Sequence, residues 1–396
     1  MIASAHPEAS VGGVEILVLS NDVVPGFGVP VAAPGLRADG VAQGLRQNGF
    51  DVEVLVPTDV LRLAGPATLN PPGGVSAVEP TELMTFIEGH RANVVVFINA
   101  NLTPHLRPLP GVTFVYDLFA PKMLERLASS PEPATWDVEV AKKERALALA
   151  DLVWVNGRRK LGYALGWLMR PGVEEQRALL GKPSILASDP AARVSLVEMP
   201  VVATSSDTSS EPASGAIQVG IAGYAQHWSR LRNEHPGHRA IVDAGHSLHA
   251  LLPQHWAAGD TPAAASALPT ETIVHRGPLL LEDFHGWVRS MDAMVDVFPQ
   301  SAERRLAMIT RSAVALGWGV PVIHGVDSEI ADIIVEYDAG WVETSDDPGR
   351  WKAIAEELND ADTLARKREG AERAAAQRFA PQIALRAAAQ SLRALT

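Results

Sequence analysis

The sequence predicts an α/β protein with two doubly wound domains that face each other across a cleft. Short apolar segments alternate with helical segments through the first half of the chain, a pattern typical of parallel sheets covered on both faces. Residues 204–215 read TSSDTSSEPASG, which is the composition of a linker, and a second α/β pattern starts directly after them. The length of 396 residues also exceeds what a single hydrophobic core usually serves.

In the first half of the chain, each expected strand is a short apolar segment bounded by turn residues or a helix. We expect strands at residues 14–20, 52–56, 93–98, 112–116 and 152–155, and helices at residues 36–47, 81–89 and 136–150. Gly49 ends the first helix and Pro57 closes the second strand. These segments predict an N-terminal domain over residues 1–203. The alternative interpretation treats residues 204–215 as a long surface loop inside one domain.

The second half repeats the pattern. We expect strands at residues 217–222, 272–275, 293–297 and 320–323, a further apolar strand candidate at 240–242, helices at 281–291 and 306–318, and an Ala-rich helical tail from residue 351. These segments predict a C-terminal domain over residues 216–380. Pro381 should break or kink the helix before it, so residues 381–396 are expected to form a separate C-terminal helix. Whether that helix crosses back to the N-terminal domain stays open.

Composition excludes several classes of protein. The net charge of −12 argues against a general nucleic-acid binder, which needs a basic face to replace the counterions of phosphate. The chain has no Cys, which excludes disulfides, thiolate metal sites and Cys nucleophiles. No apolar run reaches the ~18 residues of a membrane span, and no secretory signal is recognisable at the N-terminus. We therefore expect a cytoplasmic location.

Residues 158–170 leave peripheral contact with the inner face of a membrane as a hypothesis. This segment combines a basic flank with a cluster of large apolar residues, which is typical of interfacial helices. An ordinary packing helix with a solvated basic start has the same composition and is the favoured interpretation.

Ligands of doubly wound sheets bind beyond the carboxyl ends of the strands, so the residues after each strand are the candidate site. After the first strand, Gly26, Gly28 and Gly35 permit close approach of a ligand to the backbone, and the helix after Gly35 offers free N–H groups. A flexible connection is the competing interpretation, and no G-x-G-x-x-G fingerprint is present. Asp117 ends another apolar strand, where a carboxylate could act as a base or orient a hydroxyl; helix capping is an equally good explanation.

The richest loop follows the strand at 293–297. It leads into a helix whose N-terminus carries partial positive charge, and Arg304, Arg305 and Arg311 add cations near it. A diphosphate requires this combination of donors and charge. Arg304 and Arg311 are two helical turns apart and could share a face, whereas Arg305 is better explained as solvated. His275 also follows a strand and could contact a ligand, but the histidine spacing matches no tight zinc motif, so no metal site is expected.

Several motifs of this sequence resemble those of retaining glycosyltransferases of the GT-B fold, family 4, and most closely a bacterial branch associated with polysaccharide and other glycoconjugate pathways. In the second half the motifs are ERRLA at 303–307, TR at 310–311, GVPVI at 319–323 and YDAGW at 337–341. In the first half they are PGLR at 34–37, GFDVEV at 49–54, YDL at 116–118 and ADLVWV at 150–155. The resemblance covers most of the chain but is thin from residue 157 to 270.

The resemblance implies a glycosyltransferase that retains anomeric configuration, needs no metal or other cofactor, and uses a UDP-, GDP- or dTDP-sugar as donor. The second domain would bind the donor and the first a saccharide, lipid-linked or other glycoconjugate acceptor. The implied donor-binding residues are Gly223, His275, Arg304, Thr310 and Arg311. The implied acceptor-binding residues are Gly26, Gly28, Gly35, Arg37 and Tyr116. The implied catalytic residues are Asp117, Glu303 and Arg311, with the arginine neutralising the departing diphosphate.

Two departures from the family pattern keep other functions open. Leu306 and Val314 occupy the positions of the family's paired Glu residues, for which Glu303 could substitute, and Tyr116 and Asp117 stand where many members have a His. The chain could therefore be a degenerate GT-B partner subunit that assists another transferase. An epimerase or phosphorylase on the same frame is a third hypothesis, although the Lys context of a phosphorylase cofactor site is not found.

Overall fold

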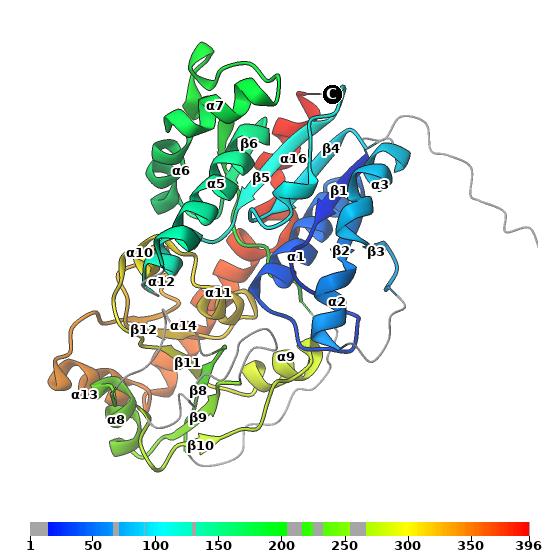
Figure 1. Ribbon diagram of the computed structural model, residues 1–396. Coiled ribbons are helices and arrows are strands. Elements are labelled where there is room, and N and C mark those ends of the chain that lie inside the picture. The colour runs from blue at the N-terminus through cyan, green and yellow to red at the C-terminus, as the bar shows by residue number, and fades with distance from the viewer. Residues whose placement is uncertain are drawn as a thin grey trace, which may run out of the picture.

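The computed structural model describes residues 15–65, 71–90, 92–128, 132–203, 216–224, 233–253 and 267–395. Within these ranges two parallel sheets, each covered by helices, form two domains (Figure 1). This arrangement confirms the predicted α/β class with two doubly wound units. The segment interpreted as a linker, residues 204–215, lies outside the described residues.

The N-terminal domain is built on a sheet of seven described strands, in the order β3-β2-β1-β4-β5-β6-β7. The central strands consist almost entirely of buried apolar residues because helices cover both faces. The order reverses between β1 and β4, and crevices for ligands form at such points. The strands are β1 (Glu15–Leu19), β2 (Asp51–Pro57), β3 (Val75–Val78), β4 (Val94–Ile98), β5 (Thr113–Leu118), β6 (Leu152–Val155) and β7 (Val194–Leu196).

The N-terminal domain has two apolar cores, one on each face of its sheet, and alternate side chains of β1 point into one core or the other. Val18 packs in one core with Val41 of α1, whereas Leu17 packs in the other with Ile87 of α3 and Leu147 of α5. Adjacent residues of a strand point to opposite faces, so both faces of the sheet are buried. The helices are α1 (Ala33–Gln47), α2 (Thr58–Ala64), α3 (Leu83–His90), α4 (Lys122–Ala128), α5 (Pro133–Leu149), α6 (Leu161–Leu168) and α7 (Pro171–Leu179).

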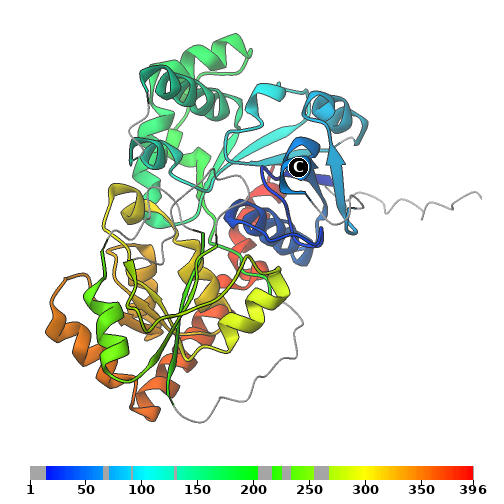
Figure 2. The same ribbon diagram turned by 60° about the horizontal axis from the view of Figure 1, so that its bottom comes forward.

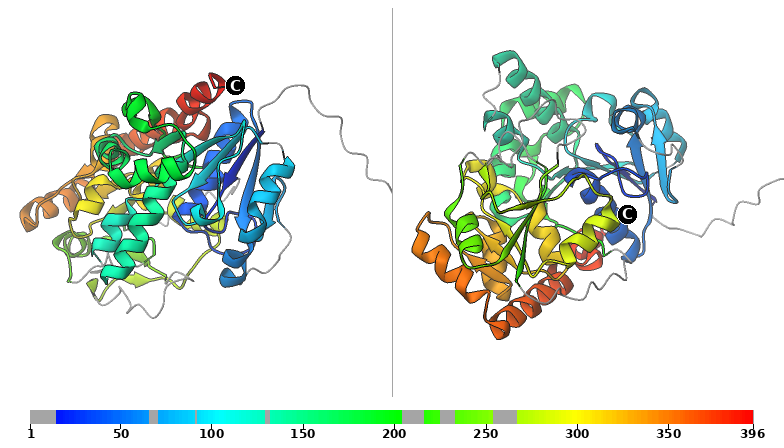
Figure 3. Two further views of the ribbon diagram at one scale, coloured as in Figure 1. Left: turned by 45° about the horizontal axis from the view of Figure 1, so that its top comes forward. Right: turned by 90° about the horizontal axis from the view of Figure 1, so that it is seen from below.

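The C-terminal domain has a sheet of six described strands, in the order β10-β9-β8-β11-β12-β13. Helices α8 and α13 cover one face, and α9, α11 and α14 cover the other (Figures 2 and 3). The strands are β8 (Gln218–Ala222), β9 (Ser247–Leu251), β10 (Ile273–Val274), β11 (Ala293–Asp296), β12 (Val322–His324) and β13 (Gly340–Val342). The helices are α8 (Pro236–Asp243), α9 (Leu281–Arg289), α10 (Ala302–Leu306), α11 (Thr310–Gly317), α12 (Glu329–Tyr337), α13 (Pro348–Glu357) and α14 (Ala361–Ala374).

The C-terminal helices run from the second domain back to the first. After α14 and a π-helical turn (Ala375–Phe379), α15 (Pro381–Ala384) and α16 (Arg386–Arg393) pack against α1 (Figure 1). A Cβ atom at Gly44 of α1 would lie 2.5 Å from the carbonyl oxygen of Pro381, so only glycine permits this approach. Asn48 Nδ2 donates to the carbonyl oxygen of Gln382 at 2.9 Å. The crossing thereby ties the two domains together.

Two expected elements were wrong. Residues 240–242, a strand candidate, lie in helix α8, where Ala240 and Ile241 form the buried side of an amphipathic helix. The helix expected at 306–318 is divided into α10 and α11. Residues 307–309 between them are buried, and Ile309 is extended, with φ −65° and ψ 101°. The break divides the face that Arg304 and Arg311 were expected to share.

Two of the three basic residues at 158–160, Arg159 and Lys160, interact with other parts of the protein. Lys160 is fully buried, and Arg159 forms ion pairs with Asp327 at 2.6 Å and Asp332 at 2.9 Å. Nearby on α6, Tyr163 and Trp167 lie over the ammonium group of Lys143. None of the helices in the described ranges combines the length and apolar composition needed to cross a bilayer.

Candidate active site in the interdomain cavity

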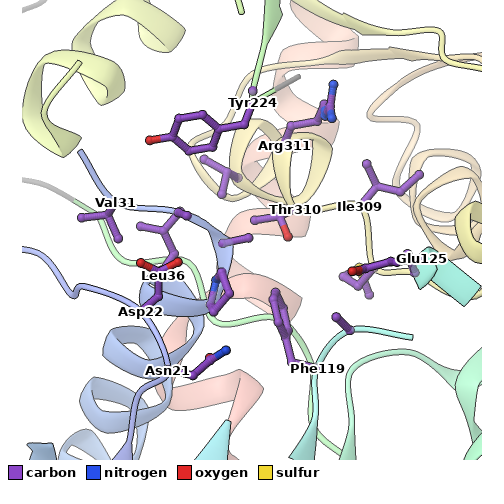
Figure 4. A pocket seen from close by; sticks show the side chains of 18 of the residues that line it. Asn21, Asp22, Val31, Leu36, Phe119, Glu125, Tyr224, Ile309, Thr310 and Arg311 are labelled. Carbon is purple, nitrogen blue, oxygen red and sulfur yellow. The ribbon is translucent and has the colours of Figure 1, made fainter. Parts of the chain in front are cut away.

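A cavity of about 470 Å³ lies between the two domains. Its N-terminal wall comes from the loops after β1, β4 and β5, and its C-terminal wall from the loops after β8, β9, β10 and β11. Figure 4 shows Asn21, Asp22 and Leu36 on one side and Tyr224 and Thr310 on the other. The carboxyl ends of both sheets therefore meet at one space, as the doubly wound fold predicts.

Two arginines and one phenylalanine form the charged part of the C-terminal wall. The guanidinium carbons of Arg304 and Arg311 lie 4.7 and 4.1 Å from the ring centroid of Phe298, which follows β11. Both arginines line the cavity. Arg304 is only 2% exposed, and neither its Nε nor Nη1 of Arg311 has a hydrogen-bond partner among the described residues. Buried donors without partners make this wall suited to an anion.

A buried carboxylate lies near both arginines. Oδ1 of Asp296, the last residue of β11, is 3.6 Å from Nη1 of Arg304 and 3.9 Å from Nε of Arg311. Burial opposes its charge, but the arginines hold the pKa of Asp296 below its usual value. Burial lowers the pKa of the adjacent His324 to about 4, so that ring is neutral at pH 7. One carboxylate therefore balances two cations.

The N-terminal end of α11 adds partial positive charge at the same place. Ile309, Thr310 and Arg311 line the cavity, and no side chain caps the first turn of this helix. The free N–H groups of a first helical turn attract anions. Gly223, after β8, has φ +111°, and a Cβ atom there would lie 3.2 Å from Nε of Arg311. Glycine at 223 thus lets the backbone after β8 lie against this guanidinium.

Glu303 lies in the cavity wall where the two domains meet. Its helix, α10, contacts α4 and the 3-10 turn η3 (Arg158–Lys160) of the N-terminal domain. Burial raises the pKa of Glu303 to about 7, although Arg304 acts in the opposite direction, and the carboxylate of Glu125 across the cavity raises it further. Burial likewise lowers the pKa of Lys160 to about 7. Both groups are therefore expected to titrate near neutral pH.

Asp117 and Arg37 form a buried ion pair rather than part of the cavity lining. Nε of Arg37 donates to Oδ2 of Asp117 at 2.7 Å, and both side chains are fully buried. The remaining donors of Arg37 reach the carbonyl oxygens of Val197 and Glu198. This pair joins α1, β5 and the segment after β7. The geometry favours a structural role for both residues.

The other residues expected on the acceptor side are also absent from the cavity lining. Tyr116 is buried and stacks on Phe97, with 5.2 Å between ring centroids. Gly26 and Gly28 have φ values of +100° and +69° and shape the loop after β1. At Gly35 a Cβ atom would lie 1.8 Å from the carbonyl oxygen of Val23, so this glycine lets the loop pack on α1.

Of the five residues expected to bind the donor, four line the cavity and one does not. Gly223, Arg304, Thr310 and Arg311 line the cavity, as does Glu303 from the catalytic set. His275 does not line it: its Nε2 is 2.8 Å from Nδ1 of His249, and its ring packs against Trp287. Among the described residues no group of three or more His, Asp or Glu side chains is arranged to hold a metal ion.

Sequence reasoning missed several residues of the site. Asn21, Asp22, Phe119 and Glu125 line the N-terminal wall, and Tyr224 lines the C-terminal wall. All except Glu125, which lies on α4, closely follow a strand, so the strand-end rule points to them, but only the glycines and Asp117 were selected there. Asp296 was missed because it was counted as part of an apolar strand. A charged residue inside an otherwise buried strand is the signal that could have found it.

No protein-family model and no curated protein sequence matches this chain. Among solved structures, sucrose-phosphate synthase from Thermosynechococcus elongatus is similar, with a TM-score of 0.62 and 13% identity over 96% of this chain and 98% of that one. WaaG, a glycosyltransferase involved in lipopolysaccharide biosynthesis, gives 0.57 and 11% over 95% and 98%. AviGT4, a glycosyltransferase involved in avilamycin A biosynthesis, gives 0.55 and 15% over 96% and 98%. Together with the two parallel sheets, these similarities show that the chain has the GT-B fold.

Proposed function

We propose that this protein is a glycosyltransferase that moves a sugar from a nucleotide-sugar donor to a saccharide or other glycoconjugate acceptor. The observation that carries this proposal is the pair of arginines in the wall of the interdomain cavity: Arg304, buried on α10, and Arg311, largely buried in the first turn of α11. Two guanidinium groups and a helix N-terminus can bind a diphosphate and stabilise the charge that develops on it as it leaves. Similarity of fold to known glycosyltransferases supports the same reading.

In this proposal each wall of the cavity binds a different substrate. The donor diphosphate lies against Arg304, Arg311 and Thr310, and the acceptor enters along the wall formed by Asn21, Asp22 and other N-terminal residues. Transfer without a metal belongs to the proposal, because the arginines supply the positive charge that the leaving group needs. Retention of anomeric configuration belongs to it through the sequence motifs that resemble retaining enzymes. The donor would be a UDP-, GDP- or dTDP-sugar.

A thermal-shift screen with UDP, GDP and dTDP tests the donor site, with the matching nucleoside monophosphates as controls. A ligand that binds only the folded state raises its stability by mass action, so we expect one diphosphate to raise the melting temperature more than its monophosphate does. Release of that nucleotide from its sugar conjugates then tests turnover. No stabilisation by any diphosphate at millimolar concentration would contradict the proposal. Binding without any turnover would favour the partner-subunit hypothesis.

Donor binding is expected to weaken as the pH rises from 6 to 8. Below pH 7 Glu303 is mostly protonated and neutral, whereas above pH 7 its carboxylate adds negative charge beside Arg304. Lys160 loses its positive charge over the same range. Glu303→Gln should bind a sugar nucleotide at pH 8 more tightly than the wild type does, and should retain only the smaller pH dependence due to Lys160.

Isothermal titration with an intact sugar nucleotide measures this effect, because its diphosphate diester keeps two negative charges at both pH values. Glu282→Gln is a matched control, since Glu282 is an exposed acid on α9 that does not line the cavity. An unchanged pH dependence in Glu303→Gln would show that this carboxyl does not face the donor.

A further inference from the structure

We propose that Asp296 is the internal counter-ion of the anion site: it positions Arg304 and Arg311 while the cavity is empty, and its charge opposes the anion that binds in front of them. This inference rests on the proposed function only in naming that anion as a diphosphate. Asp296 does not line the cavity. It is a positioning residue that acts through the two arginines.

The carboxylate is held rigidly behind the arginines. Its strand, β11, lies between β8 and β12, and the Asp296 side chain is 3% exposed. Oδ2 accepts a hydrogen bond from Oγ of Ser312 at 2.8 Å. Oδ1 has no hydrogen-bond partner among the described residues, although both arginines lie within 4 Å of it.

The distances between Asp296 and the two arginines are too long for hydrogen bonds. At 3.6 and 3.9 Å the arginines are attracted to Asp296 without being hydrogen-bonded to it. The unused donors, Nε of Arg304 and Nη1 of Arg311, stay available for a ligand. A carboxylate that bound both guanidiniums directly would occupy the donors that face it, Nη1 of Arg304 and Nε of Arg311. Ser312 keeps the carboxylate where it balances charge and leaves the donors free.

Removal of Asp296 would change the net charge behind the cavity wall, and with it both stability and anion affinity. With Asp296, the two arginines carry a net charge of about one; without it, both lose the carboxylate that lies within 4 Å of them, which is costly for the empty protein. An added anion would then replace the missing negative charge. A unit charge a few ångströms away changes anion affinity by about tenfold or more at the effective dielectric of a protein.

The test is Asp296→Asn, which keeps the shape of the side chain and removes its charge, with inorganic pyrophosphate as the probe. We expect a lower melting temperature for the empty variant, and a pyrophosphate dissociation constant about tenfold or more below that of the wild type. Asp117→Asn is the matched control, because it also removes a buried carboxylate from an arginine but lies outside the cavity lining. It should lose stability with no change in pyrophosphate affinity.

A second variant covers the case in which Asp296→Asn does not fold. Ser312→Ala removes the hydrogen bond that holds the carboxylate back, so Asp296 can move onto the arginines and compete with the ligand. We expect pyrophosphate binding several-fold weaker than in the wild type, opposite in sign to Asp296→Asn.

Three outcomes would count against these proposals in different ways. Wild-type binding of pyrophosphate with unchanged affinity in both variants would overturn the counter-ion role alone. The expected changes with pyrophosphate, without any effect of nucleoside diphosphates, would overturn the proposed donor alone. No binding of pyrophosphate to any of the proteins would overturn both, because the arginines would then bind no anion.

Discussion

Replacing Arg311 with alanine is expected to weaken the binding of a nucleoside diphosphate by about 10- to 150-fold, corresponding to the roughly 1.5–3 kcal/mol of a hydrogen bond to a charged group. Arg311 contributes a cation at the N-terminal end of α11, and its Nη1 has no other partner among the described residues. Burial lowers the pKa of Arg311 to about 10, so it stays charged at neutral pH. Turnover of the sugar nucleotide should fall at least as much as binding, because the charge on the diphosphate grows in the transition state.

The matched control for this variant is Arg305→Ala. Arg305 lies on the same short segment but is exposed and does not line the cavity. Calorimetric titration of both variants with the stabilising diphosphate separates a local contact from a general loss of positive charge. Equal affinity in Arg311→Ala and the wild type would remove Arg311 from the donor site. An equal loss in both variants would mean that overall charge, rather than the site, attracts the ligand.

Replacing Arg378 with alanine is expected to lower the free energy of unfolding by about 3–5 kcal/mol, the usual cost of leaving a buried charge without its partner. Arg378 lies in the π-helical turn and is 9% exposed. Its guanidinium binds Glu198 at 3.1 Å, Glu329 at 3.1 Å and Glu336 at 3.0 Å. Glu198 follows β7 of the first domain, whereas Glu329 and Glu336 belong to α12 of the second.

Glu329 extends this cluster to the 3-10 turn η3 of the first domain. It is 3% exposed, and its Oε2 accepts a hydrogen bond from the backbone N–H of Arg159 at 3.2 Å. Without Arg378, two largely buried carboxylates, Glu198 and Glu329, would face each other with no shared cation. Burial already raises the pKa of Glu198, so the loss should shrink as the pH falls and Glu198 takes up a proton.

Urea denaturation at pH 7 measures this effect, with Arg366→Ala as the control. Arg366 pairs with Asp338 at the surface, where the two side chains are 54% and 41% exposed, and surface pairs contribute about 0–1 kcal/mol. A similar loss in the two variants would contradict a special role for the Arg378 cluster. An unfolding transition that divides into two steps would instead show that the cluster couples the domains.

The fold could be predicted because its signals are local. Near-continuous apolar segments such as residues 93–98 indicate strands buried on both faces, and the structure places β4 there. The errors occurred where a short apolar segment fits either element. Residues 240–242 are buried on one side only, which is typical of a helix, but three residues are too few to show a helical period.

The candidate site was predictable only in part. The charge and spacing of the loop after β11 pointed to Arg304 and Arg311, and both line the cavity. The helical face they were expected to share does not exist, because residues 307–309 interrupt the helix; the ring of Phe298 brings the two guanidiniums together instead. Side-chain stacking of this kind depends on the path of the loop, which the residue pattern does not contain.

Apolar periodicity and strand-end chemistry were enough to predict two doubly wound domains and a cleft lined by residues that follow strands, because burial and backbone hydrogen bonding act over a few neighbouring residues. Tertiary structure decided which charges face that cleft. Arg37 and Asp117 are eighty residues apart and neutralise each other in the interior, whereas Arg304 and Arg311 share one carboxylate and keep unused donors. A charged side chain can bind a ligand only if its protein partners leave it a free donor, and those partners are known only once distant segments have come together.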